Sequence, residues 1–314
     1  MGNILRYWNQ NRKRIIIGLV AIASIIFIIQ ILNNIAKQQK EIRVNKVELT
    51  EYEQNLPTES IIGGKTVSLN TTKSNVGIIE EFVQKCNNGD VTGAYNMLTD
   101  YCKEAIYPTE ENFRESYYKI YFASKKVMNI ENFLSGSGRY TYLVKLYDDV
   151  LSSGTMENAK VFQDYITIDE SSENGKVNVN SFIYKNDVNK SVEKNGIVLT
   201  VLAQEVYKDN EKLQIKVENN TDKRILIDTR ERSKSIYLVG SNSVVYGSNI
   251  AEIASVLYQI PSHISRTYKL RFNKTYSSSV KTSGIVFSDI VPDYEAYEQA
   301  PNETKDRVQI SVSI

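Results

Sequence analysis

The sequence predicts a chain of two folded domains, an α+β domain followed by an all-β domain, behind one membrane anchor. Three observations predict this. Residues 15–32 form an uncharged apolar run. Within residues 74–185 the apolar spacing changes from helical to alternating. From residue 196 to residue 314, short β-type segments are separated by turn residues. The part after the anchor is long enough for two ordinary domains.

The apolar run is long enough to cross a bilayer. Its 18 residues, Ile15 to Leu32, carry no charged side chain. As a helix they would span about 27 Å, close to the thickness of the hydrocarbon core. We therefore expect a transmembrane helix over 15–32, with a membrane as its partner. Representative anchor residues are Ile15, Leu19, Ile25, Phe27 and Leu32.

The charges beside this run predict its orientation. Residues 1–14 carry Arg6, Arg12, Lys13 and Arg14 and no acidic residue, whereas residues 33–50 mix both signs. The positive-inside rule then leaves 1–14 as a cytoplasmic tail and the rest of the chain extracytoplasmic. The alternative is a cleaved signal peptide. The small residues 21–23 would suit its cleavage site, but they lie inside the apolar run, so we expect an uncleaved anchor in the cell membrane.

Composition excludes several classes of function. There are 38 basic and 37 acidic residues, and they are interspersed. Because there is no basic stripe, nucleic acid is not expected as a partner. The single histidine, His263, excludes a multi-histidine zinc site and is expected to be an exposed turn residue. No loop carries a regular calcium-binding or phosphate-binding pattern, so we predict no metal and no cofactor.

Residues 33–73 are expected to form a stalk or linker. Apolar residues recur every seven positions, but the companion positions of the heptad are polar, so only half of a coiled-coil seam is present. The apolar set is Ile28, Ile35, Ile42, Leu49 and Leu56. The pattern favours a solvated helix that fades into a linker near Pro57, with weak homo-oligomerisation through the stalk as the alternative.

The segment 74–185 predicts three helices followed by a four-stranded antiparallel sheet. Ser74 and Asp90 are expected to cap the first two helices, and Pro108-Thr109 to open a third with Phe113, Tyr117, Ile120 and Tyr121 facing the core. Four segments rich in β-branched and aromatic residues then follow, with glycines between them. They are Lys126–Phe133, Arg139–Val150, Ala159–Ile168 and Lys176–Tyr184.

The two cysteines, Cys86 and Cys102, fall near the C-terminal ends of the first two predicted helices. In an antiparallel helical hairpin those ends are too far apart for a disulfide. We favour two free, buried thiols and keep a disulfide as the alternative.

Residues 82–98, FVQKCNNGDVTGAYNML, resemble the opening helical hairpin of the nuclear transport factor 2-like superfamily. Residues 166–168 and 174–182 look like its two closing strands. The resemblance implies a cone, in which a curved sheet wraps around a helix, and says little about function. Enzymes of that superfamily, such as ketosteroid isomerases, use a buried Asp base and a Tyr donor.

By that resemblance, the candidate ligand-binding residues of the cone are Tyr140, Tyr142, Asp164 and Tyr165. Asp164 and Tyr165 are adjacent on a strand, so they cannot both line the cone. The alternative interpretation is that the tyrosines fill the core and that Asp164 is solvated. No catalytic residue is assigned.

A polar linker over 186–195 is expected to lead into an all-β sandwich over 196–314. Its predicted strands include Gly196–Tyr207, Lys212–Asn219, Ser255–Ile260 and Arg307–Ile314, with no helix among them. Residues 213–221, LQIKVENNT, resemble the immunoglobulin-like domains of Gram-positive lipoproteins and surface proteins. The Cys…Trp…Cys pattern of true immunoglobulin domains is missing.

These features together predict a non-enzymatic, membrane-anchored extracytoplasmic binding or scaffold protein with other envelope proteins as partners. The anchor followed by a cone domain is similar to the bitopic subunits of secretion and conjugation machines. One alternative is an enzyme or small-ligand binder that uses the cone. An open cavity with an inward carboxylate would favour this alternative. Another is a cell-wall or glycan-binding role for the sandwich, marked by a row of exposed aromatics on one sheet.

Overall fold

The computed structural model describes residue 30 and residues 56–63, 66–149, 161–172, 175–230, 234–248 and 254–314. Apart from residue 30, the predicted anchor over 15–32 lies outside the described residues, and so do residues 33–55 of the predicted stalk over 33–73. The last five residues of that predicted stalk, 69–73, belong to a helix. No helix within the described part of the chain is long and apolar enough to cross a membrane. Residues 57–314 form one unit by their contacts, and mixed α and β structure with several antiparallel sheets makes up that unit.

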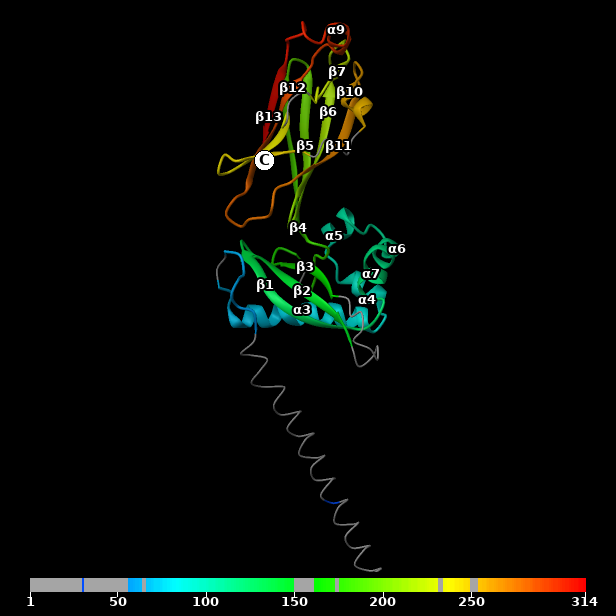
Figure 1. Cartoon of the computed structure of the whole chain (residues 1–314), viewed down its shortest axis with the longest axis vertical. Helices are drawn as coiled ribbons and strands as arrows, with labels where there is room; N and C mark the ends of the chain where they lie inside the picture. The colour runs from blue at the N-terminus through cyan, green and yellow to red at the C-terminus, as the bar shows by residue number, and fades with distance from the viewer. Residues whose placement is uncertain are drawn as a thin grey trace, which may run out of the picture. The chain divides into compact units, whose positions relative to one another are not determined.

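The longest described helix is α3, Leu69–Asn87, which runs along one face of the first sheet (Figure 1). It begins earlier than predicted. Ser68, not Ser74, is its N-cap, and the Ser68 hydroxyl accepts from the Thr71 backbone N–H at 3.2 Å. The two serines offer the same capping chemistry. The earlier start lets the first turns bury the side chains of Thr72 and Asn75.

The second predicted helix is two short helices. Asp90 caps α4, Val91–Asn96, as predicted. The chain then stops and restarts at Thr99, whose hydroxyl accepts from the Cys102 N–H at 3.0 Å and begins α5, Asp100–Ala105. Spacing alone could not show this break, because Leu98 and Cys102 remain on one buried face.

The third helix opens at Thr109 as predicted, but it contains a π-helical turn. It comprises α6, Glu110–Phe113, the π-helix η1, Arg114–Tyr118, and α7, Lys119–Tyr121. Phe113 and Tyr117 are fully buried. Ile120 was expected in the core and is instead 52% exposed. The wider π turn shifts the helical register after Tyr117, so a residue placed by 3.6-residue spacing turns outward.

The first sheet has three antiparallel strands in the order β1-β2-β3, not the four predicted. The strands are β1, Lys126–Gly136, β2, Arg139–Asp148, and β3, Val161–Asp169. In the predicted fourth strand, residues 177 and 178 form only isolated bridges. Asn180 and Ser181 then take left-handed φ values of 57° and 63°, which ends any extended run.

After this turn the chain enters a different sheet. Strand β4, Phe182–Lys194, pairs with β5, Ile197–Tyr207. The predicted linker over 186–195 is therefore the outer half of β4 and its turn. Asn195 and Gly196, with φ values of 53° and 74°, make a tight hairpin turn between the two strands.

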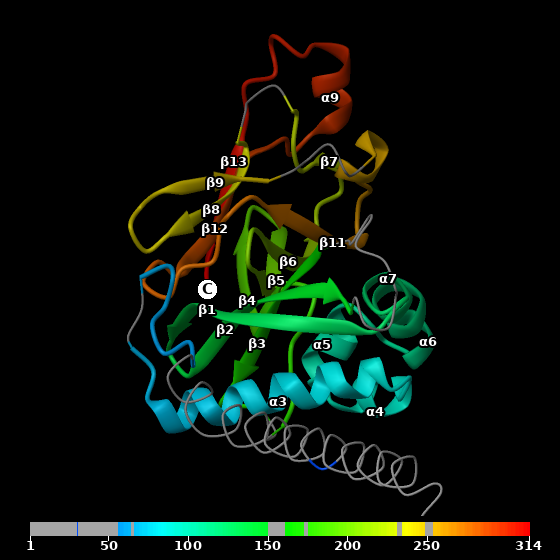
Figure 2. The same ribbon diagram turned by 60° about the horizontal axis from the view of Figure 1, so that its bottom comes forward.

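The remaining strands form two four-stranded antiparallel sheets, β11-β6-β5-β4 and β13-β12-β8-β9 (Figure 2). A two-residue pair, β10-β7, completes the strand pairing among the described residues. Their apolar faces share one buried cluster built from alternate residues of each strand. The bounds are β6 Glu211–Asn219, β7 Ile225–Leu226, β8 Ile236–Gly240, β9 Val245–Gly247, β10 Gln259–Ile260, β11 Ser265–Phe272, β12 Thr282–Ile290 and β13 Val308–Ser313.

Two local predictions for this region are wrong. Residues 255–260, expected as a strand, form the 3₁₀ turn η3, Ser255–Tyr258, followed by the short β10. A helix that was not expected, α9, covers Tyr294–Gln299. Asp293 is its N-cap and accepts from the Ala296 N–H at 3.1 Å.

Candidate functional site

The space between the helices and the first sheet is filled by aromatic rings. Phe113 and Tyr117 stack with ring centroids 5.3 Å apart, and Tyr117 stacks on Tyr121 at 4.6 Å. Phe82 and Tyr107 contact the same cluster edge-on or tilted. Such rings contribute a large buried area and fix one another's orientation. The place where the family resemblance implies a cone pocket is thus occupied by core side chains.

Asp164 lies at the end of this ring cluster and is buried, not solvated. Its Oδ2 accepts from the Tyr117 hydroxyl at 2.7 Å and from the Asn180 N–H at 2.9 Å. Its Oδ1 accepts from the Ser181 N–H at 3.1 Å and from the Tyr165 N–H at 2.7 Å. Burial raises the pKa of Asp164, and these donors oppose that rise. With both oxygens engaged, the carboxylate holds the 180–181 turn and is 2% exposed.

Tyr142 and Tyr165 do not join Asp164. Tyr142 is fully buried, and its hydroxyl accepts from Asn75 Nδ2 at 3.2 Å. Tyr165 packs on the opposite face of the sheet, with its ring 4.7 Å from that of Phe133 and 4.3 Å from Lys208 Nζ. The prediction that Asp164 and Tyr165 face opposite sides is confirmed.

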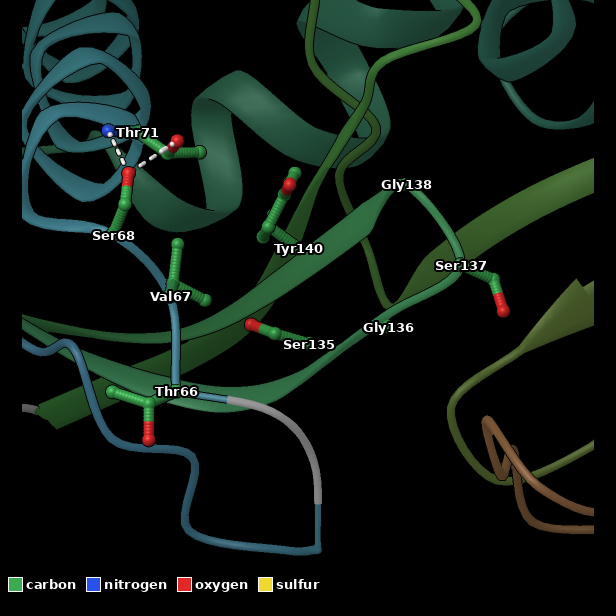
Figure 3. A pocket seen from close by; sticks show the side chains of 9 residues that line it. All are labelled: Thr66, Val67, Ser68, Thr71, Ser135, Gly136, Ser137, Gly138 and Tyr140. Carbon is green, nitrogen blue, oxygen red and sulfur yellow. Dashed lines mark hydrogen bonds between the residues drawn. The ribbon is translucent and has the colours of Figure 1, made fainter.

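Of the four predicted residues, Tyr140 lines one of the pockets in the described part of the chain (Figure 3). This pocket, of about 330 Å³, lies between the start of α3 and the turn that joins β1 to β2. Its described lining is Thr66, Val67, Ser68, Thr71, Ser135, Gly136, Ser137, Gly138 and Tyr140. The Tyr140 hydroxyl donates to Glu170 Oε1 at 2.6 Å, and this bond raises the pKa of Tyr140 to about 12.

The sequence gives only a weak signal for the other residues of this pocket. The Ser-Gly-Ser-Gly run at 135–138 is recognisable as a turn between strands. That the start of α3 faces this turn depends on the earlier helix start and on a loop that returns to β1. In that loop the N–H groups of Ile61 and Ile62 donate to the carbonyls of Asn132 and Phe133 at 2.9 and 3.0 Å.

A second pocket, of about 350 Å³, lies near α5 and is lined by Thr99, Asp100, Tyr101, Ser171, Ser172 and Lys176. Its one amine, Lys176 Nζ, donates to the Asn96 carbonyl at 2.6 Å. Elsewhere in the described part of the chain, no group of three or more His, Cys, Asp or Glu side chains could hold a metal ion. His263 is an exposed turn residue with a φ of 57°, as expected.

Both cysteines are free and buried, as favoured from the sequence. Burial raises the pKa of both thiols, that of Cys102 to about 12, and this favours the protonated, less nucleophilic form at neutral pH.

The residues that join the first sheet to the following strands were missed from sequence. The Arg139 guanidinium lies 4.0 Å from the Tyr184 ring of β4 and pairs with Asp169 at 2.8 Å. Lys208, just after β5, places its amine over Tyr165, and its carbonyl accepts from the Tyr276 N–H at 2.8 Å. Such cation–π contacts between segments distant in sequence have no local signature.

One row of exposed apolar side chains crosses the outer face of the first sheet. Val127 of β1 lies opposite Tyr147 of β2, and Tyr147 lies opposite Val161 of β3. These side chains are 52%, 36% and 52% exposed. Residues 150–160, between β2 and β3 in the sequence, lie outside the described residues.

Comparison with known proteins gives no relative for this chain. No protein-family model matches it, and neither a curated protein nor a solved structure does.

Proposed function

We propose that this protein is a non-enzymatic scaffold of the cell envelope, anchored in the membrane through residues 15–32 with its folded domains outside the cell. In this proposal its partners are other envelope proteins of a secretion or conjugation-type complex. The part over 69–181 would be a variant of the nuclear transport factor 2-like cone, with three strands instead of four. The part over 182–314 would be an immunoglobulin-like sandwich.

The filled interior of the first domain is the observation that carries this proposal. An enzyme of the ketosteroid isomerase type needs a carboxylate that faces a cavity open to substrate. Here Asp164 accepts four hydrogen bonds from the protein itself, and Tyr117 occupies the space beside it. This arrangement favours a structural use of the carboxylate over proton transfer.

The contacts between the first sheet and β4 support a scaffold role as well. The Arg139–Tyr184 stack and the Lys185–Glu104 ion pair, at 2.7 Å, tie β4 to the α+β part, while β4 itself pairs with β5. These contacts restrict the motion of the two parts against each other. A protein that presents surfaces on both parts to its partners then loses less orientational freedom on binding.

The row Val127–Tyr147–Val161 offers a surface for a protein partner. Adjacent exposed apolar side chains on neighbouring strands are a feature of protein contact sites. The ring of Tyr147 adds a large apolar area with a polar tip, which suits a contact residue.

Photocrosslinking in intact cells tests the proposal. A photoreactive amino acid replaces Tyr147 in the full chain, and covalently attached proteins are identified after irradiation. Val192 of β4, also apolar and 36% exposed, is the matched control position. We expect Tyr147 to yield an adduct with a protein that carries its own membrane span or export signal, and Val192 to yield none.

Two results would overturn the proposal. One is the absence of a protein adduct at Tyr147 together with turnover of a small molecule by the purified full chain. The other is equal adduct formation at Tyr147 and Val192, because this would show contact without a specific surface.

A further inference from the structure

The pocket beside Tyr140 has an uncharged, hydroxyl-rich described lining. Ser68 and Thr71 contribute side-chain hydroxyls on one side, and Ser135, whose hydroxyl donates to Asn132 Oδ1 at 2.8 Å, lies on the other. Val67 and the Tyr140 ring contribute the apolar part, as Figure 3 shows. A hydroxyl group is both a donor and an acceptor, so this lining matches a ligand that also carries both kinds of group.

Two of these hydroxyls are hydrogen-bonded to each other. Ser68 Oγ and Thr71 Oγ1 lie 2.8 Å apart and share one hydrogen bond, in which either can be the donor. One hydroxyl hydrogen of the pair therefore stays available for a ligand, together with acceptor lone pairs. Neighbouring hydroxyls on a sugar ring are spaced similarly. The pair can thus donate to one sugar hydroxyl while it accepts from the next.

The Tyr140 ring is held in place for an apolar contact. Its hydroxyl is fixed by Glu170 at 2.6 Å, so the ring remains at the wall of the pocket. On the neighbouring turn, Gly138 has a φ of +75°, and a Cβ there would lie 3.2 Å from Glu170 Oε2. Glycine thus lets the carboxylate approach the turn and hold the ring. An immobilised aromatic face is suited to the C–H face of a pyranose.

The charges described around the pocket favour a neutral ligand over an anionic one. None of its described lining residues is basic. The Glu170 carboxylate, which holds Tyr140, adds negative charge beside it. The start of α3 favours negative charge, but its Ser68 cap already accepts from the Thr71 N–H. A volume of about 330 Å³ is at the lower end of the range for ligand pockets and would hold about one or two sugar rings.

We propose that this pocket binds a neutral carbohydrate. Tyr140 would stack on the sugar ring, and the Ser68–Thr71 pair would form hydrogen bonds with its hydroxyl groups. Glu170 is a positioning residue that acts through Tyr140. This site lies in the α+β part of the chain, and the scaffold role proposed above does not depend on it.

Saturation-transfer NMR and calorimetry on the full chain test this proposal. The chain is kept in a detergent without a sugar headgroup, and the probes are cellobiose, maltose and N,N′-diacetylchitobiose. Glucuronate and inorganic phosphate serve as charged comparisons. We expect at least one neutral disaccharide to bind, and neither charged probe to compete with it.

Matched variants locate the binding. Tyr140→Ala should weaken binding about tenfold, which corresponds to the loss of one ring contact. Tyr140→Phe, which keeps the ring but loses Glu170, should weaken it less. Tyr147→Ala, on the same strand but outside the pocket, should leave it unchanged. The proposal is overturned if no neutral sugar binds up to its solubility limit, if phosphate displaces the sugar, or if Tyr140→Ala and Tyr147→Ala have equal effects.

Discussion

The Tyr117 hydroxyl donates a 2.7 Å hydrogen bond to Oδ2 of Asp164, and this contact joins the helical layer to strand β3 of the first sheet. The same carboxylate accepts from the N–H groups of Asn180 and Ser181, the two left-handed residues that direct the chain into β4. Asp164 therefore links three parts of the fold through one buried side chain.

Replacing Asp164 with asparagine should strongly destabilise the fold. The amide has only one acceptor oxygen, and its NH₂ group would face backbone donors. Because a buried donor or acceptor left without a partner costs about 1–3 kcal/mol, we expect a loss of about 3 kcal/mol. Urea denaturation of the full chain measures this. Asp222→Asn, whose side chain is 97% exposed, is the control and should change stability by less than about 0.5 kcal/mol. An unchanged midpoint for Asp164→Asn would contradict the role given to this residue.

The comparison of wild type with Asp164→Asn also gives a prediction for the pH dependence of stability. Burial raises the pKa of Asp164 above its usual 3.8. As pH rises, Asp164 therefore loses its proton in the unfolded state at a lower pH than in the folded state. The contribution to stability is therefore fully present below pH 3.8 and declines as pH rises through the folded-state pKa. The free energy of unfolding of wild type minus that of Asp164→Asn should fall across this window, by at most about 1.4 kcal/mol per pH unit. A difference that grows with pH would mean that the hydrogen bonds outweigh burial.

Two glycines should respond in opposite ways to the same substitution. Gly196 has a φ of +74°, and a Cβ there would lie 3.0 Å from Thr221 Cγ2, so Gly196→Ala should cost about 1–2 kcal/mol. Gly77 is exposed inside α3 with nothing within 4 Å of a Cβ. Gly77→Ala should therefore stabilise the protein by about 0.5–1 kcal/mol. Thermal denaturation of both variants checks the prediction, and shifts of the same sign would contradict it.

The buried ion pair between Lys274 and Glu211 gives a further prediction. The two charged groups are 2.6 Å apart, with each side chain 2% exposed. Lys274→Met leaves an unpaired buried carboxylate and should cost about 3–5 kcal/mol. The double variant Lys274→Met, Glu211→Gln carries no buried charge and should be less destabilised than Lys274→Met alone. Lys190→Met, at an exposed site, is the control. A purely additive double-mutant cycle in urea would mean that the two charges are not coupled.

Much of the fold follows from local sequence patterns. In strands such as β6 and β13 buried residues alternate with residues that are partly or fully exposed, and period-two spacing predicts them. Asp90 and Thr109 are helix caps with the expected hydrogen bonds. These features depend on neighbours within a few residues, so they are visible in one sequence.

The errors arise where a distant residue decides the local structure. Residues 176–184 alternate like a strand, but their turn at Asn180 and Ser181 is held by Asp164, which lies 16 and 17 residues away. The choice of Ser68 over Ser74 as the cap depends on what the first turn of α3 buries. The surroundings of the predicted site residues depend on distant contacts in the same way: Asp164 accepts hydrogen bonds from that turn, whereas Tyr140 lines a pocket among the described residues.

The most direct test of the proposed placement is cysteine labelling in intact cells. The native thiols Cys86 and Cys102 are buried, so they should give little background with a membrane-impermeant maleimide. Asp100→Cys introduces a thiol at a fully exposed side chain of the first domain, and Asn3→Cys introduces one before the predicted anchor. We predict that Asp100→Cys is labelled in intact cells and that Asn3→Cys is labelled only after permeabilisation. Protection of Asp100→Cys in intact cells, or loss of residue 3 from the mature chain, would contradict an anchored protein with extracytoplasmic domains.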